Sequence, residues 1–228
     1  MKSGMEIALF PLPNLVLFPQ VAVPLHVFEE RYKKMINQCI DQSDVFGLVL
    51  LRPDAEEESE ETIHRVGVTA RVVEVERLKD GRMNILSAGE SRFRILRFIG
   101  RSPYWTASVD LFEDQEEPSS ALSEAYAEVS RLYRQATELT GDIKAGDSDL
   151  ALPESPVALS YVVSYVLDIE PAQKQLLLET TSTLDRLNSL ITHLEDNLKK
   201  LEGQSARKRV ASKARTNGDL RKRHGQIE

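Results

Sequence analysis

The sequence predicts an α+β fold in which a β-rich half precedes a helical half. Short apolar runs separated by turn residues dominate the chain up to residue 117, and apolar positions at spacings of three and four dominate from Pro118 onward. The 228 residues are enough for two modest domains that each bury a core without disulfides or metal. We therefore predict a β-rich domain at 1–117, a helical bundle at 118–203 and a basic, disordered tail at 204–228.

The most informative stretch is the apolar run from Phe10 to Tyr32, which holds four of the ten prolines. Each proline removes a backbone donor and favours extended structure at the preceding residue, so short strands should alternate with turns. Such a run cannot form a membrane-spanning helix, and its broken apolar segment is unlike a signal peptide. We expect it to lead into a helix that begins between Phe28 and Tyr32.

Several strands are expected after this helix. Val45 to Leu51 is an apolar run of strand length, and Val66 to Val75 alternates until its phase slips near Val72 and Val73, which indicates a β-bulge. Asp80 and Gly81 suit a type I′ hairpin turn leading into a strand at 83–86. Further strands are expected at 93–98, after Gly89, and at 105–111, so the first half should form a barrel or a sandwich.

Four helices are expected in the second half. Apolar spacing predicts the first between Leu122 and Leu139, followed by a loop at 141–152. Ser155 and Pro156 supply an N-cap and a first-turn proline for a helix that runs through Leu167, and Pro171 can start a short third helix.

The last helix should begin at a capping box formed by Ser182 and Asp185 and stop at Gly203. Its apolar positions fall at alternating spacings of three and four; they are Leu184, Leu187, Ile191, Leu194, Leu198 and Leu201. We favour packing of this seam against the two preceding helices. A self-associating structural protein that pairs through the seam is the alternative.

Charge is divided unevenly along the chain. Residues 204–228 carry 8 Lys and Arg against 2 Asp and Glu, a net charge of +6, whereas the remainder carries −13 of the total of −7. The body should therefore repel nucleic acid, and only the tail could attract phosphates. Cys39 is the single cysteine, which together with the lack of an export or lipidation signal favours a cytoplasmic protein.

No set of residues suggests catalysis, so we expect a protein that is not an enzyme and has no cofactor. The Gly-rich match at 141–146 has Asp147 where a phosphate-binding loop needs lysine, and no strand precedes it. The four histidines are scattered and Cys39 is alone, so no metal site is expected. The acidic run between Glu56 and Glu61 is interpreted as a solvated loop.

Several motifs occur in an order that carries more information than any one of them. They are FPL at 10–12, VLFP at 16–19, PLHVFEERY at 24–32, FGLV at 46–49, VGVTA at 66–70, DGR at 80–82, GESRF at 89–93 and PY at 103–104. Together they resemble the N-terminal substrate-binding domain of the ATP-dependent protease Lon, especially short proteins that carry this domain without a protease. Glu30 departs from the proline that is common at its position.

The resemblance continues more loosely through QKQLLLE at 173–179 and RL at 186–187, so it spans roughly residues 5 to 202. It implies a PUA-like β pseudobarrel followed by a C-terminal helical bundle, and a role in recognition without ATPase or protease activity. Our leading hypothesis is a binding module for unfolded or exposed polypeptide, with an adaptor for a protease or chaperone as one form of it. A polypeptide could add to an open strand edge or lie in an apolar groove.

The candidate polypeptide-binding residues are aromatic or charged. They are Phe28, Glu29, Arg31, Tyr32, Arg92, Phe93, Tyr104 and Trp105. For each aromatic residue the alternative is core packing, and for Glu29 and Arg31 it is a pair that stabilises the fold. Arg92 could bind an anion, or could lie on the face of its strand opposite Phe93, where arginine is ordinary. A second function class is nucleic-acid binding through the PUA-like fold and the basic tail, which lacks aromatic residues for base stacking.

Overall fold

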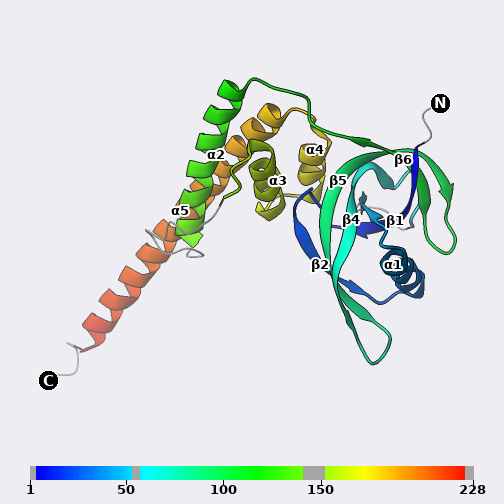
Figure 1. The fold of residues 1–228 in the computed structure, drawn as a ribbon. Coiled ribbons are helices and arrows are strands. Elements are labelled where there is room, and N and C mark those ends of the chain that lie inside the picture. The colour runs from blue at the N-terminus through cyan, green and yellow to red at the C-terminus, as the bar shows by residue number, and fades with distance from the viewer. Residues whose placement is uncertain (1–3, 53–56, 141–151, 224–228) are drawn as a thin grey trace.

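In a computed structural model of the chain, which describes residues 4–52, 57–140 and 152–223, a β-barrel is joined to a helical bundle (Figure 1). The strands are β1 (Met5–Pro13), β2 (Ala22–Val27), β3 (Phe46–Leu51), β4 (Ile63–Arg77), β5 (Met83–Gly100) and β6 (Thr106–Phe112). The helices are α1 (Glu30–Gln42), α2 (Ser119–Thr140), α3 (Pro156–Val166), α4 (Pro171–Glu179) and α5 (Thr183–Arg223). This architecture confirms the predicted α+β class and the order of its two halves.

The six strands form one sheet in the order β2-β5-β4-β3-β1-β6, and an additional pairing of β5 with β6 closes five of them into a barrel. The first half is thus a barrel and not a sandwich. All neighbouring strands are antiparallel except β1 and β3, which are parallel and are connected through β2 and α1. Strand β2 lies outside the closed ring because it pairs only with the first part of β5.

The proline-rich run folds as its sequence predicts. Residues 5–8 of β1 pair with β6, whereas residues 9–13, which include Pro11 and Pro13, pair with β3. The two prolines, which have no backbone N–H to donate, therefore lie in the part of β1 that pairs with β3 and not with β6. Pro24 lies in the edge strand β2, where proline is also tolerated. Asn14 and Gln20 have positive φ angles in the turn between the strands.

The hairpin between β4 and β5 is confirmed, but its turn differs from the prediction. Gly81 has φ +84° while Asp80 has no positive φ, so the turn is not type I′. Leu78 and Arg82 form the closing backbone hydrogen bond, 2.8 Å long, and the Gly81 N–H donates to the Leu78 carbonyl over 3.0 Å. This is a three-residue loop in which glycine occupies the left-handed position after the first turn.

A register shift between Val72 and Glu74 confirms the predicted bulge in β4. The predicted break at Gly89 is wrong, because β5 runs through it from Met83 to Gly100. A Cβ atom on Gly89 would lie 2.4 Å from the carbonyl oxygen of Phe18. Glycine is needed here because two segments of backbone approach each other closely, and the strand does not end.

The four predicted helices of the second half are present. Ser155 caps α3 by accepting from the Ala158 N–H over 3.5 Å, and Pro171 starts α4. The Ser182 hydroxyl accepts from the Asp185 N–H over 2.9 Å, as predicted, and Glu117 accepts from the Leu184 N–H over 3.0 Å. The predicted loop at 141–152 and its Gly-rich match lie almost wholly outside the described residues.

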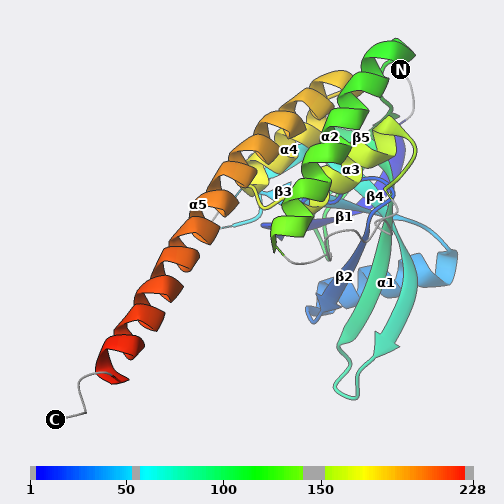
Figure 2. The same ribbon diagram turned by 90° about the vertical axis from the view of Figure 1, so that its left-hand side faces the viewer.

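The seam of α5 is buried inside the chain's own bundle. Of the predicted seam residues, Leu187, Leu194 and Leu198 are buried and Leu184, Ile191 and Leu201 are half-buried. Leu190, which the spacing did not include, is also buried, and α5 packs along α2 and α3. The prediction of packing within the chain is therefore confirmed, with α2 taking the place expected for α4. The predicted stop at Gly203 is wrong, because α5 continues to Arg223 and extends away from the body (Figure 2).

One large apolar cluster extends from the barrel into the bundle. It includes Phe18 and Met83 of the barrel half, Leu159 of α3 and Leu187 of α5. A second cluster inside the barrel is built around Phe93 and Val109. The two predicted domains therefore share a continuous core.

Candidate polypeptide-binding site

The second half of β4 has an open edge. Strand β3 begins at Phe46, which pairs with Ala70, so residues 71–77 of β4 extend beyond the end of β3. These residues pair with β5 on one side. Among the residues that the structure describes, no strand pairs with them on the other side. Backbone donors and acceptors along such an edge can pair with an added strand.

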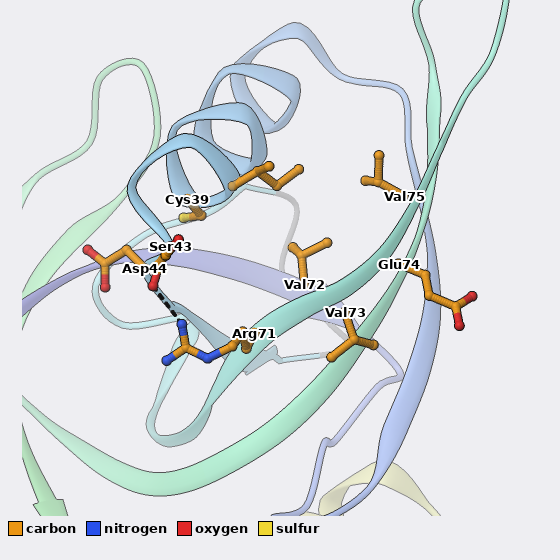
Figure 3. A pocket seen from close by; sticks show the side chains of 9 residues that line it. Cys39, Ser43, Asp44, Arg71, Val72, Val73, Glu74 and Val75 are labelled. Carbon is orange, nitrogen blue, oxygen red and sulfur yellow. Dashed lines mark hydrogen bonds between the residues drawn. The ribbon is translucent and has the colours of Figure 1, made fainter.

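Helix α1 runs along this edge and forms the other wall of a groove. The side chains of Val72 and Val75 point toward the helix, on which Cys39 lies (Figure 3). Ile40 of the helix also lines the groove. The bulge at Val73 explains this arrangement, because an extra residue brings Val72 and Val75 to the same face of the strand. The groove has a volume of about 230 Å³, which suits one or two side chains of an extended peptide.

Arginine side chains fix both ends of the groove. Arg71 donates to the Ser43 carbonyl over 2.6 Å and forms an ion pair with Glu90 at 2.5 Å. At the other end Arg77 donates to Asn37 of α1 over 2.7 Å. These bonds hold α1 beside the strand and keep the groove at a defined width.

The groove has the chemistry of a binding surface. Burial, with a smaller contribution from the Asp44 charge, raises the pKa of Cys39 to about 11. Its thiol therefore stays protonated near neutral pH and behaves as a small apolar group. Val73 and Val75 are 51% and 38% exposed, so apolar surface is available beside the open edge.

Most of the predicted site residues lie elsewhere, around the start of α1. Phe28 is 61% exposed and its ring lies 6.1 Å from that of His26. Arg31 donates to Glu29 and, through both terminal nitrogens, to Glu58. Tyr32 and Trp105 are buried, and the Tyr32 hydroxyl and Trp105 Nε1 also donate to Glu58.

The other predicted site residues lie apart from this group. Phe93 is fully buried inside the barrel, and Tyr104 donates to Gln38 over 2.8 Å at the end of the barrel near α1. The expected placement of Arg92 on an ordinary outward face is wrong, because Arg92 is 2% exposed and covered by the helical half. Its guanidinium donates to the carbonyls of Leu178 and Thr180.

Arg92 belongs to a buried polar cluster that joins the two halves. Arg92 and Arg186 both form ion pairs with Asp114, and Arg186 also stacks on Tyr161 at 4.4 Å. Burial alone would raise the pKa of Asp114, but hydrogen bonds and charge from Arg186, aided by Thr183 and Arg92, hold it below its usual value. The cluster therefore fixes the bundle on the barrel and leaves Arg92 unavailable to a ligand in this conformation.

Sequence reasoning missed three acidic residues that organise the fold. Glu58 was assigned to a solvated run, although its side chain is only 18% exposed. Asp114 and Glu117 lie in an acidic linker with no apolar pattern. Only their distant partners on α1, α3 and α5 reveal their roles, so no local signal could have found them.

Within the described ranges, no three His, Cys, Asp or Glu side chains come together in a way that could hold a metal ion. None of the helices described here is long and apolar enough to cross a membrane.

The fold and these features can be compared with known proteins. The family model for the ATP-dependent protease La (LON) substrate-binding domain matches residues 6–196. The chain belongs to this family. The Lon protease of Aquifex aeolicus is 29% identical over 206 residues, covering 86% of this chain and 26% of that protein. The Lon protease of Flavobacterium johnsoniae is 27% identical over 202 residues, covering 86% of this chain and 25% of that protein.

This member of the Lon substrate-binding domain family thus spans about a quarter of the curated relatives it matches. Among solved structures, the N-terminal domain of the Mycobacterium avium complex Lon protease aligns with a TM-score of 0.68 at 21% identity, covering 84% of this chain and 99% of that one. A Lon N-terminal domain protein from Xanthomonas campestris aligns with a TM-score of 0.59 at 21% identity, covering 82% and 98%. These likenesses show the fold.

Proposed function

We propose that this chain is a non-catalytic recognition module that binds unfolded or exposed segments of polypeptide and presents them for proteolysis or quality control. Membership of a substrate-binding family supports a role in recognition. The observation that carries the proposal is the open edge of β4 at residues 71–77, beside an apolar groove. A protease or a chaperone is the partner that such a module would serve, in the reducing cytoplasm.

The open edge explains how one site could accept many sequences. Main-chain hydrogen bonds to residues 71–77 would be available to any extended segment, whatever its side chains. Every second side chain of such a segment would face α1, where Ile40, Val72 and Val75 offer apolar contact. The site therefore favours extended segments with alternate apolar residues, which unfolded proteins expose and folded proteins hide.

A charged side chain in the groove tests this proposal. Val75→Asp places a carboxylate where an apolar side chain of the ligand would pack, so the affinity for fluorescein-labelled casein should fall by about tenfold. Val75 is exposed, and the fold should tolerate the change. Fluorescence anisotropy measures the affinity.

Val166→Asp is the matched control, because Val166 is 48% exposed on α3, outside the groove. This variant should bind casein as tightly as the unchanged chain. Equal loss of affinity in both variants, or no loss in either, would count against the groove as the binding site.

A further inference from the structure

The side chain of Glu58 lies in a cradle formed by Arg31, Tyr32 and Trp105. Arg31 donates from Nη1 to Oε2 over 2.9 Å and from Nη2 to Oε1 over 2.6 Å. The Tyr32 hydroxyl donates to Oε1 over 3.1 Å, and Trp105 Nε1 donates to Oε2 over 3.1 Å. Each carboxylate oxygen thus accepts one bond from Arg31 and one from an aromatic side chain. Planar, bidentate pairing of this kind is the geometry in which arginine recognises carboxylates.

The cradle is held in place by groups other than Glu58. Glu29 accepts from Arg31 Nε over 2.9 Å, and the Arg31 guanidinium lies 4.4 Å from the centre of the Tyr32 ring. The Tyr32 ring in turn stacks on Phe10 at 4.1 Å. Burial and the nearby Glu58 charge raise the pKa of Tyr32, so its hydroxyl remains a donor. Arg31 and Tyr32 are therefore held by contacts other than those with Glu58.

A second hollow opens next to the cradle and shares Trp105 with it. Its volume is about 580 Å³, and Phe98 and Ile99 of β5 contribute apolar surface. The Phe98 and Trp105 rings meet at 5.2 Å, with Arg65 over Phe98 and Arg101 over Trp105. A ligand that carries an apolar side chain next to a carboxylate would fill both parts, with the carboxylate in the cradle and the side chain over these rings.

We propose that the cradle of Arg31, Tyr32 and Trp105 is a carboxylate-binding subsite for polypeptide ligands, and that Glu58 of the same chain occupies it in competition with them. The carboxylate could come from the C-terminus of a polypeptide or from an Asp or Glu side chain within it. The inference rests on the proposed function only in requiring that the ligand is a polypeptide.

Exchange of one carboxylate for another explains how a ligand could enter a site that is already filled. A ligand carboxylate can accept the same four hydrogen bonds and carries the same charge as Glu58, so no buried donor is left unpaired. Glu58 has the advantage of a high effective concentration because it is tethered to the site. The ligand must offset this advantage with apolar contact in the adjacent hollow, which would give the subsite its preference for an apolar neighbour of the carboxylate.

Trp105 is the single tryptophan, so its fluorescence reports binding at the cradle directly. The test uses three short peptides without tryptophan: one ending in Ala-Phe with a free carboxylate, the same peptide with an amidated C-terminus, and the amidated peptide with an internal Glu before the Phe. We expect the free acid to change Trp105 fluorescence and to bind at least about tenfold more tightly than the amide. Binding of the third peptide would identify a side-chain carboxylate as a second source.

Glu58→Gln distinguishes a binding cradle from a purely structural one. The amide in this variant has one acceptor oxygen and no charge, so it should compete less well than Glu58 with a peptide carboxylate for the donors of the cradle. The free-acid peptide should therefore bind about tenfold more tightly to this variant than to the unchanged chain. Glu57→Gln, with the same charge change at an exposed neighbouring residue, should leave the affinity unchanged. Arg31→Gln should abolish the difference between free acid and amide.

Equal affinity of free acid and amide for the unchanged chain and for Glu58→Gln would overturn the inference, as would no binding of either peptide to Glu58→Gln when circular dichroism shows it folded. In that case, a loss of casein binding in Val75→Asp would still support the groove as the polypeptide-binding site. Failure of the cradle is therefore distinguishable from failure of the recognition module itself.

Discussion

At the scale of single residues, buried charge fixes how the two halves meet. Asp114 is the shared anion for Arg92 and Arg186, and its side chain is 8% exposed. The backbone carbonyls of Leu178 and Thr180 accept hydrogen bonds from Nη1 of Arg92. Removing one member of such a cluster leaves the others buried without compensation, which costs more than the cluster contributes when complete.

Asp114→Asn should lower the free energy of unfolding by about 3–5 kcal/mol, because two buried guanidiniums lose their anion. Urea unfolding followed by circular dichroism measures the change. The matched control is Asp110→Asn, since Asp110 is exposed on β6, and it should change stability by less than about 0.5 kcal/mol. A similar small change at Asp114 would show that the cluster does not hold the halves together.

The same residue gives an expected pH dependence. The pKa of Asp114 is lower in the folded chain than its ordinary value of 3.8, so the charged form stabilises the fold. This stabilisation is present above the unfolded-state pKa and is lost as the pH falls below about 4 toward the folded-state pKa. Asp114→Asn should therefore flatten this part of the acid-unfolding curve, and an unchanged acid dependence would contradict the assignment.

At the scale of helices and strands, local patterns predicted where elements occur better than how they end. An apolar run located β3 and alternation located β4 and β6, while capping residues located α3 and α5 and a first-turn proline located α4. Glycines were harder to interpret, because a glycine can mark a turn, a place where two backbone segments approach closely, or neither. Gly81 does mark a turn, Gly89 marks a close approach of backbone, and Gly203 lies within a helix with no atom within 4 Å of a Cβ placed there.

Two glycine-to-alanine changes should have opposite effects. Gly81→Ala forces an alanine into the left-handed region and should destabilise the chain by about 1–2 kcal/mol. Gly203→Ala should stabilise α5 by about 0.5–1 kcal/mol, because alanine favours a helix interior. Chemical denaturation measures the first and helical circular dichroism on heating the second. A loss of helix in Gly203→Ala would indicate that α5 ends there after all.

The candidate site could be predicted only in part. An open strand edge or an apolar groove was expected in general terms, but neither was located. The groove exists because β4 continues to Arg77, past Ala70, which pairs with the first residue of β3. It also depends on the bulge at Val73, which turns Val72 and Val75 toward α1. Such relations arise from the register of distant segments and leave no local pattern. Glu58 was missed for the same reason, since its three partners lie on α1 and beside β6.

At the scale of the whole molecule, the barrel and bundle share one core while α5 extends beyond it (Figures 1 and 2). The open edge of β4 and the cradle at Glu58 flank opposite ends of α1, so this helix connects the two surfaces that we propose for polypeptide binding. The Lys and Arg residues after Gly203 all lie on the extended part of α5. Recognition by the body should therefore not depend on them.

The most direct test of the central claim is hydrogen exchange with and without a permanently unfolded polypeptide. An added strand would protect the backbone amides of residues 71–77, so their exchange should slow by at least about tenfold when casein is bound. The chain lacking residues 204–228 should show the same protection. Unchanged exchange at 71–77 under conditions where casein is bound, or protection confined to the basic end of α5, would contradict the account.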